Sequence, residues 1–338
     1  YGAVSAIIPI FIPHLGCPND CVFCNQRKIA GTLSAPKKTD VEKLIAEGIS
    51  KNSGKAPAVA FYGGSFTAID EHLMDEYLDA AQGFLKRGEI SSVRLSTRPD
   101  CIDERILKKL AESGVRTIEL GAQSMDERVL KASRRGHMAE DVVRASNLIK
   151  SAGFELILQM MTHLPESGER SDTETAEKIA SLHPDGVRIY PTVVVRDTCL
   201  EELWRSGKYT PCTPDSAARL GAKLIGIFEK HNVPVIRFGL NPTDDLSGGE
   251  ALGGAYHPAL GEMALSYRYL NLFEREMEKQ SRKTDALTIF VNPRRVSAMC
   301  GQKKHNKDVI CKKYGIRKLK ICGKEELADG EVIVRFDS

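Results

Sequence analysis

The chain has 338 residues, of which 42% are hydrophobic and 28% are charged. This composition is typical of soluble globular proteins and argues against a largely disordered or collagen-like chain. The length allows one large domain with an appendage, or two domains. No run of about 18 apolar residues is present, so we expect no transmembrane helix. Because the sequence begins at Tyr1 rather than Met, we expect a start segment to be missing from it.

The net charge of +3 is unevenly distributed along the chain. Residues 294–325 contain eleven lysines and arginines against two acidic residues, a local charge of +9, so the remainder carries −6. A basic segment on an acidic body indicates a polyanionic partner. A solvated basic surface without a partner is the alternative interpretation.

Apolar, β-branched runs alternate with segments of helical periodicity through about residue 240. This alternation predicts parallel βαβ units in a curved sheet that is covered by helices. The expected strands are Ala6–Phe11, Val59–Tyr62, Val93–Ser96, Thr117–Leu120, Leu156–Met161, Val187–Tyr190 and Val233–Phe238. The expected helices are Val41–Ile49, Glu71–Leu85, Glu104–Ser113 (with Asp103 as its N-cap), Ala139–Ala152 and Pro214–His231.

Three of the nine cysteines, Cys17, Cys21 and Cys24, are crowded into one segment with the spacing C-x3-C-x2-C. Three thiolates so placed can each hold one iron of a [4Fe–4S] cluster, and no fourth cysteine lies nearby. The fourth iron would then be open to an external ligand. Zinc with His14 as its fourth ligand is the alternative. The odd number of cysteines and the absence of a signal peptide indicate a reducing, cytoplasmic environment.

The cysteine segment follows an apolar strand and has Phe23 directly before its third cysteine. It resembles the signature of the radical S-adenosylmethionine (SAM) superfamily. The resemblance implies that the open iron binds the amino and carboxylate groups of SAM, and that the reduced cluster cleaves SAM to methionine and a 5′-deoxyadenosyl radical. It also implies an α/β fold, a partial (β/α)6 TIM-like barrel with its ligands at the C-terminal ends of the strands.

Further motifs at the strand ends are similar to the SAM-contacting motifs of this superfamily. Gly63, Gly64 and Ser65 follow the second strand, where adjacent glycines let the backbone approach a ligand, with a plain tight turn as the alternative. Members of the superfamily often have Glu where Ser65 stands, so backbone carbonyls are expected to make that contact. By the same resemblance, Phe23 and Thr97 are predicted to lie at the cofactor.

Two later stretches resemble the Elongator catalytic subunit and the oxygen-independent coproporphyrinogen dehydrogenase. They are ELGAQS at residues 119–124 and the run ending in RRGH at residues 134–137. The resemblance places Gln123 and Arg135 near the methionine and ribose of SAM, and an arginine suits the SAM carboxylate; an exposed helical arginine is the alternative. Gln159 is polar within an apolar run, and a buried polar side chain needs a partner. The resemblance places it where relatives have a residue that bonds the ribose or adenine.

The likeness to the Elongator subunit continues through two loop motifs. Tyr190 ends the sixth strand, where it is expected either to face the substrate or simply to pack. Residues 237–244 and 253–258 are expected to form a loop that closes over the barrel mouth. His257 in that loop is a candidate substrate contact, with an ordinary loop histidine as the alternative. Fewer than about 70 residues follow, too few for an acetyltransferase domain.

The C-terminal segment changes character. Leu287–Val291 and Arg317–Ile321 are expected strands, and Val296–Tyr314 carries helical segments around the turn Gly301-Gln302-Lys303-Lys304. This order resembles the KH RNA-binding module, with Lys304 in place of its second glycine. We therefore expect a partial barrel over residues 1–270 and a small basic α+β module over residues 271–338. The candidate RNA-binding residues are Arg294, Arg295, Lys303, Lys304 and Lys307.

Together these features predict a radical SAM enzyme that modifies a base in transfer or ribosomal RNA. The expected cofactors are a [4Fe–4S] cluster and SAM, and the expected partners are RNA and an electron donor such as flavodoxin or ferredoxin, with no membrane. Two alternatives are a radical SAM enzyme of small-molecule metabolism and a non-catalytic RNA-binding relative.

Overall fold

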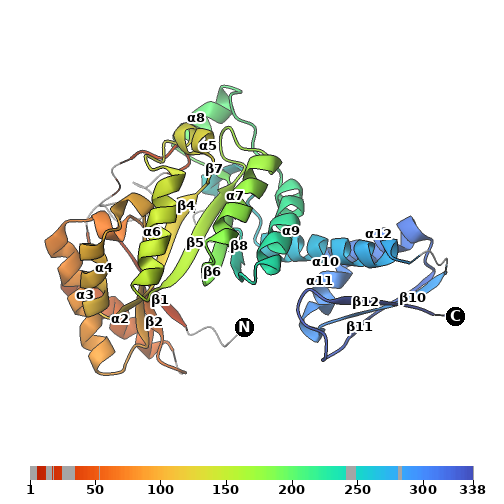
Figure 1. Ribbon diagram of the computed structural model, residues 1–338, viewed down its shortest axis with the longest axis horizontal. Helices are drawn as coiled ribbons and strands as arrows, with labels where there is room; N and C mark the ends of the chain where they lie inside the picture. The colour runs from red at the N-terminus through yellow and green to blue at the C-terminus, as the bar shows by residue number, and fades with distance from the viewer. Residues whose placement is uncertain are drawn as a thin grey trace.

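The computed structural model describes residues 6–12, 17, 19–24, 35–52, 54–240, 249–280 and 284–337. A curved sheet with helices on its outer side forms the larger part of the molecule (Figure 1). The long helix α10 (Leu260–Glu278) leads from it to a smaller C-terminal sheet with its own helices. Among the described helices, none combines the length and the apolar composition that spanning a lipid bilayer requires.

The large sheet has seven strands in the order β1-β2-β3-β4-β5-β6-β8, and all neighbouring pairs are parallel. Six crossovers join these strands, so the expected partial barrel is confirmed. The strands are β1 (Ile7–Phe11), β2 (Ala58–Tyr62), β3 (Ser92–Thr97), β4 (Val115–Gln123), β5 (Glu155–Thr162), β6 (Gly186–Pro191) and β8 (Val235–Phe238). Each overlaps an expected strand, and β4 is the one that runs furthest past its expected end.

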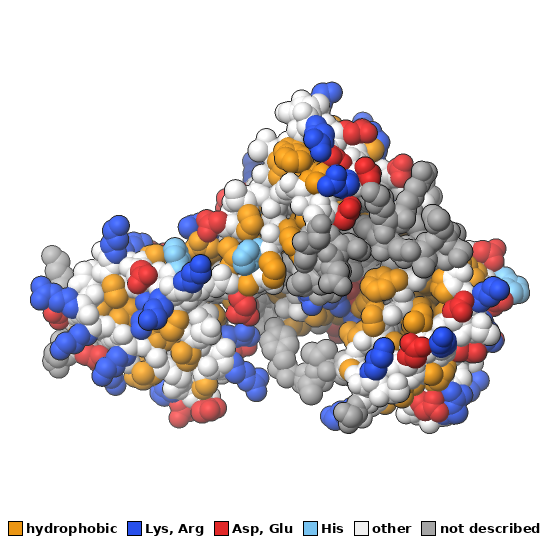
Figure 2. Space-filling view, turned by 180° about the vertical axis from the view of Figure 1, so that it is seen from behind, with side chains coloured by type: hydrophobic (Ala, Val, Ile, Leu, Met, Phe, Trp, Pro, Cys, Tyr) orange, Lys and Arg blue, Asp and Glu red, His pale blue; other side chains and the backbone are white. Residues whose placement is uncertain are grey.

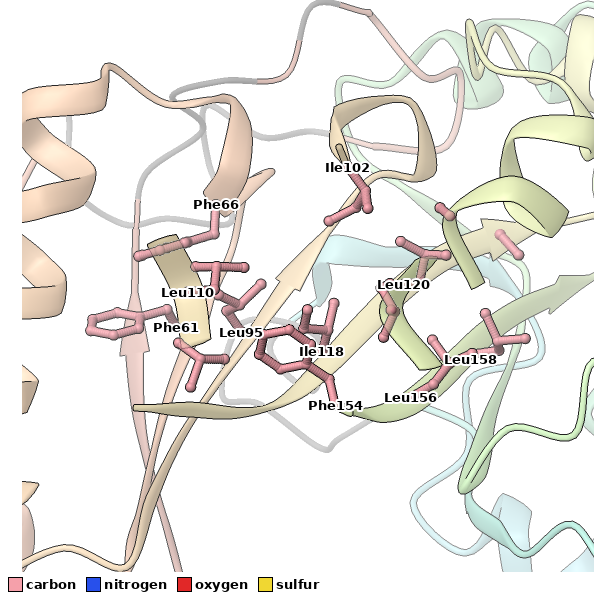
Figure 3. Packing of buried hydrophobic residues seen from close by; sticks show 14 of the residues in the cluster. Phe61, Phe66, Leu95, Ile102, Leu110, Ile118, Leu120, Phe154, Leu156 and Leu158 are labelled. Atoms are coloured by element: carbon pink, nitrogen blue, oxygen red, sulfur yellow. The ribbon is translucent and has the colours of Figure 1, made fainter. Parts of the chain in front are cut away.

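Side chains alternate along each strand between two different environments. Those that point outward are apolar and pack under the helices, where Phe61, Leu95, Ile118 and Leu156 from adjacent strands meet (Figure 3). Phe61 stacks on the ring of Phe66 with centroids 4.9 Å apart. Burying an aliphatic or aromatic side chain of this size contributes about 1.5–3 kcal/mol. The outward side of the sheet therefore supplies the main hydrophobic core, and its inward side is left for polar residues.

The helices follow their strands as the alternation predicts. Asp103 accepts a hydrogen bond from the Ile106 amide at 2.7 Å, which confirms it as the N-cap of α4. Sequence periodicity missed α5, α7, α8 and α10. The helices are α2 (Lys38–Ser50), α3 (Glu71–Lys86), α4 (Glu104–Glu112), α5 (Glu127–Ala132), α6 (Ala139–Ser151), α7 (Glu169–Ser181), α8 (Cys199–Arg205), α9 (Pro214–Lys230) and α10 (Leu260–Glu278).

The prediction that residues 237–244 and 253–258 form a loop over the barrel mouth is partly wrong. Residues 241–248 lie outside the described chain, but β9 (Ala251–Gly254) is a strand that pairs antiparallel with β7 (Val193–Val195). Gly254 has φ +98°, and a Cβ there would lie 2.7 Å from the carbonyl oxygen of Thr192. Glycine thus allows a close backbone approach here, so these glycines belong to a paired strand rather than to a free loop.

The C-terminal sheet has the order β11-β10-β12, with β10 parallel to β11 and antiparallel to β12. Its elements are β10 (Ala286–Val291), α11 (Val296–Cys300), α12 (His305–Tyr314), β11 (Lys318–Gly323) and β12 (Val332–Phe336), the last of which was not expected. Side chains of α9, α10, β10 and β12 share one hydrophobic cluster. The proposed boundary at residue 270 lies inside α10, which contributes to both parts.

Asp172 in the first turn of α7 is 3% exposed and accepts the amide of His163 at 3.0 Å. Burial raises its pKa to about 7, against the partial compensation of that hydrogen bond. Because the folded-state pKa exceeds the unfolded value, this group stabilises the fold below about pH 4, and that contribution is lost as the pH rises through 7. The free energy of unfolding of wild type, relative to Asp172→Asn, should fall by about 2 kcal/mol between pH 5 and pH 8. Urea unfolding of both proteins at several pH values measures this, and parallel curves would contradict it.

Candidate functional site

The cysteine loop lies after β1 and is fixed at two points. The amide of Val22 donates to the carbonyl of Ser133 at 3.2 Å, and the amide of Leu200 at the start of α8 donates to the carbonyl of Val22 at 2.7 Å. Val22 is 2% exposed and packs in a small hydrophobic cluster with Leu200, which the predicted residue Phe23 also contacts. The loop is therefore held between α8 and the turn that joins α5 to α6.

Arg135 in the α5–α6 turn lies directly beside the loop. One of its terminal nitrogens, Nη1, is 3.3 Å from the sulfur of Cys21, and the other, Nη2, donates to the carbonyl of Gly121 at 2.9 Å. Arg135 is 7% exposed, and no carboxylate of the described chain forms an ion pair with it. Arg98, paired with Asp100, supports it by donating to the Arg135 carbonyl at 2.6 Å. A buried guanidinium without a carboxylate partner suits a negatively charged group bound at this loop.

Gly136 brings the α5–α6 turn into close contact with the cysteine loop. It has φ +72°, and a Cβ on it would lie 2.1 Å from Nδ2 of Asn19. That same Nδ2 donates to the carbonyl of Arg135 at 3.4 Å. A side chain at this position would therefore push the Asn19 side chain away from the turn and disturb its hydrogen bond to Arg135.

The cysteines suit an iron–sulfur cluster by the chemistry of the donor set. In the described part of the chain, no three Cys, His, Asp or Glu side chains are already grouped closely enough to bind a metal ion. Cys21 is buried and Cys17 and Cys24 are half-buried in one short loop, and metal sites seldom exist fully formed without their metal. Three sulfurs beside a buried guanidinium fit an anionic cluster. His14, the ligand that zinc would need, lies outside the described residues.

The glycines after β2 have a definite structural task. Gly63 has φ +113°, and a Cβ there would lie 2.3 Å from the carbonyl oxygen of Ile12, on the chain that enters the cysteine loop. Ser65 is 1% exposed and its hydroxyl lies 3.0 Å from that of Thr97. It also accepts the amide of Arg98 at 3.3 Å. Gly63 thus lets β1 and β2 end side by side, and Ser65 and Thr97 join the ends of β2 and β3.

Polar atoms without partners gather around Gly121 near the end of β4. Gln123 has φ +64° at a register shift in the β4–β5 pairing, and its buried Oε1 accepts no hydrogen bond from the described chain. Within the same described residues, the buried Nε of Arg135 and Nη1 of Arg98 are likewise unpartnered. A Cβ on Gly121 would lie 3.0 Å from Nε2 of Gln123 and 3.3 Å from Nη2 of Arg135. This arrangement suits a polar ligand, because buried polar groups normally have partners.

A charged network that the motifs did not reveal lies on the inner face of the sheet. Glu119 is 1% exposed and accepts from the Tyr62 hydroxyl at 2.7 Å, from Arg94 at 2.6 Å and from Arg188 at 2.9 Å. Gln159, predicted as a cofactor contact, donates to the same carboxylate at 3.4 Å. Burial raises the pKa of Tyr62, and Glu119 raises it further, so this phenol is a neutral donor. The sequence signal was a charged residue at inward positions of apolar strands.

The two candidate catalytic residues are placed differently. Tyr190 is on the inner face at the end of β6, where burial raises its pKa and Arg188 and Arg237 partly oppose that rise. His257 accepts the Ala259 amide on Nδ1 at 3.1 Å, just before α10 begins. Tyr190 therefore lies with the inward polar network, and His257 forms a local turn.

The candidate RNA-binding residues lie on the C-terminal module, over which Lys and Arg side chains are spread (Figure 2). Lys303 and Lys304 are exposed in the turn between α11 and α12, and both have a left-handed backbone with φ +49° and +67°. Arg294 is also exposed, and Lys307 is half-buried. Arg295 forms a two-pronged ion pair with Asp329 at 2.8 and 3.0 Å. The exposed lysines are better placed for a phosphate than Arg295.

Residues 11–179 match the model of the Radical SAM superfamily, and residues 184–271 match the model of the Radical_SAM C-terminal domain. The chain belongs to the radical SAM superfamily. It is an enzyme of that superfamily, whose members use a [4Fe–4S] cluster and SAM, so the two expected cofactors are confirmed.

Several proteins with names are similar to this chain in sequence or in fold. The chain is 31% identical over 185 residues to Elongator complex protein 3 of Homo sapiens, covering 49% of this chain and 34% of that protein. It is 33% identical over 247 residues to the tRNA uridine(34) acetyltransferase of Dehalococcoides mccartyi, covering 62% and 53%. It therefore spans about a third to a half of the length of these relatives. The archaeal Elp3 of Methanocaldococcus infernus shares its fold, with a TM-score of 0.61 at 20% identity over 83% of this chain and 65% of that one.

Gly136→Ala should displace the cysteine loop from the α5–α6 turn and lower the iron bound after anaerobic reconstitution, because the new methyl would overlap Asn19. Gly153→Ala is the matched control, since Gly153 has φ +82° with nothing within 4 Å of an added Cβ. Both changes carry the same backbone penalty of about 1–2 kcal/mol. Iron and sulfide analysis measures the difference, and equal iron in the two variants would show that the contact does not hold the loop.

Proposed function

We propose that this enzyme cleaves SAM at a [4Fe–4S] cluster held by Cys17, Cys21 and Cys24, and that the resulting 5′-deoxyadenosyl radical modifies a base in RNA. The observation that carries the first part is the C-x3-C-x2-C loop, fixed beside the buried Arg135 in a chain that belongs to the radical SAM superfamily. An electron donor such as flavodoxin or ferredoxin would supply the electron that cleavage consumes.

The residues around Gly121 would hold SAM. Arg135 would turn its unpartnered Nε toward the carboxylate of SAM, and Gln123 would offer Oε1 to a donor such as the amino group or a ribose hydroxyl. Gly63 and Gly64 would leave backbone carbonyls open to the amino group. Ser65 and Thr97 would keep the ends of β2 and β3 together beneath it, while Phe23 packs the cysteine loop in place and Gln159 is oriented by Glu119.

Two observations support RNA as the substrate. One of the named relatives acts on tRNA by its printed name, and the C-terminal module presents Lys303 and Lys304 in an exposed turn. Binding by such a module would be mostly electrostatic. We propose the module over residues 271–338 as the part that holds the RNA while the barrel over residues 1–270 performs the radical chemistry.

Cys21→Ala should abolish SAM cleavage while the barrel stays folded, because the loop is not part of the main hydrophobic core. Cys322→Ala in β11 is the control and should keep full cleavage. The measurement is 5′-deoxyadenosine formed from SAM under dithionite, with circular dichroism to verify the fold. Undiminished cleavage by Cys21→Ala, or stoichiometric zinc in the wild type without any cleavage, would refute the assignment.

Charge reversal of both lysines, Lys303→Glu with Lys304→Glu, should weaken RNA binding across sequences. The slope of the logarithm of the RNA association constant against the logarithm of the salt concentration should also become shallower, by roughly one unit for each phosphate that the protein no longer neutralises. Lys86→Glu with Lys108→Glu, exposed on α3 and α4, is the control with the same change in net charge. Filter binding at several salt concentrations compares them. Equally weakened binding in the two double variants would mean that net charge alone acts.

The substrate class is tested separately by nucleoside mass spectrometry of RNA from a strain that lacks the gene. Loss of one modified nucleoside, restored by the wild type and not by Cys21→Ala, is the expected result. An unchanged nucleoside profile together with no RNA affinity at low salt would favour a substrate from small-molecule metabolism.

A further inference from the structure

The inner face of the large sheet carries more positive than negative charge. Arg94 on β3, Arg188 on β6 and Arg237 on β8 all lie on this face with Glu119, which is the one carboxylate that pairs with any of them in the described chain. Arg188 and Arg237 are partners in the β6–β8 register, and Gln159 is the partner of Arg188 on the other side. These side chains therefore form one connected group across neighbouring strands.

Glu119 is already fully used within this group. Its Oε1 accepts from Arg94 at 2.6 Å and its Oε2 accepts from Arg188 at 2.9 Å. Arg237 has no hydrogen bond or ion pair to the described residues. The nearby phenols of Tyr62 and Tyr190 cannot supply a second negative charge, because burial raises the pKa of each. Among the described residues, one carboxylate thus pairs with two of these three guanidinium groups, and the third has no carboxylate partner.

The charge is held in a confined position. The side chains of Arg94 and Arg188 are 16% and 12% exposed, whereas that of Glu119 is 1% exposed. The buried Nε of Arg94 also has no acceptor in the described chain. Cations withdrawn from water need a counter-charge or hydrogen-bond acceptors. The geometry of several planar guanidinium groups on one face suits a tetrahedral or planar oxyanion.

We propose that Arg94, Arg188 and Arg237, oriented by Glu119, form a phosphate subsite for the substrate inside the barrel. This inference rests on the proposed function, in which the substrate is RNA. The phosphate bound at this subsite would then be the one next to the target nucleotide. A free phosphorylated metabolite shares this chemistry. The subsite lies on the same face as Gln159, so a phosphate bound there would place the attached sugar and base near the cofactor residues at the strand ends.

The test uses the reconstituted, SAM-loaded enzyme and isothermal titration calorimetry with the four ribonucleoside 5′-monophosphates and their nucleosides as probes. At least one monophosphate should bind about tenfold or more tightly than its nucleoside, because charge-assisted hydrogen bonds to phosphate add that much affinity. Inorganic phosphate should compete with the monophosphate. Equal affinity for nucleoside and monophosphate in the wild type would overturn the proposal.

Two variants locate the effect. Arg237→Gln removes no ion pair of the described chain and should keep the thermal unfolding midpoint, yet it should lower the monophosphate preference severalfold. Arg188→Gln should bring the preference close to one, while Arg94 and Tyr62 still pair with Glu119. Arg116→Gln, which removes an exposed pair with Glu155 at the start of β4, is the matched control and should keep the full preference.

The remaining outcomes are decisive as well. If both variants still bind the monophosphate more tightly than the nucleoside, the arginines do not bind phosphate and only stabilise the interior of the barrel. The cluster's electron paramagnetic resonance spectrum reports SAM binding. If the variants bind SAM more weakly but the monophosphate as before, the arginines serve the cofactor instead. If the preference depends on the arginines but the deletion strain has normal RNA, the subsite stands and the proposed RNA function fails. Tighter binding of a short single-stranded RNA than of the mononucleotide would support RNA as the source of the phosphate.

Discussion

The contact between Arg135 and Cys21 is the interaction on which the candidate site depends. The Arg135 guanidinium is 7% exposed, and among the described residues its only acceptors are the Cys21 sulfur and the Gly121 backbone carbonyl. Its positive charge therefore has no carboxylate among those residues to balance it. It gains from any negative charge that develops on the cysteine loop, and the loop gains a fixed position in return. Arg98 and Gly136 serve this contact, the first by holding the backbone of Arg135 and the second by letting the loop come close.

The two faces of the large sheet have different roles, one in the hydrophobic core and the other in the candidate site. Outward side chains such as Phe61 and Leu95 build the core with the helices, and inward side chains such as Glu119 and Arg188 form a polar lining. Because side chains alternate with a period of two, a shift of one residue in any strand would exchange these sets. The apolar face therefore fixes the register that brings the inward charges together, and the stability of the core is a condition for the arrangement of the site.

The seven strands of the barrel could be predicted from their apolar, β-branched runs, whereas the role of Cys17, Cys21 and Cys24 as cluster ligands, inferred from their spacing, stays a prediction. Helix α7 was missed because its sequence is polar on most positions and buries small residues such as Ala176 and Thr175. β9 was missed because its pairing with β7 is set by a distant segment and its two glycines have no strand preference. Arg94, Glu119 and Arg188 were missed because they lie on three different strands, and only the register shows that they meet.

Helix α10 has a consequence for how the molecule opens. Phe273 and Leu270 on it are buried in the cluster that also contains Ala218 of α9 and Leu287 of β10, and the Asn306 side chain of α12 donates to the Ser266 carbonyl within it. Because α9 and β10 both pack on α10 in this one cluster, α10 cannot unwind without loosening the barrel helix and the C-terminal sheet together. Amide hydrogens of α9, α10 and β10 should accordingly belong to one cooperative unit in native-state hydrogen exchange. The orientation of the basic module relative to the barrel is then a rigid property of the fold, as it would not be with a flexible tether.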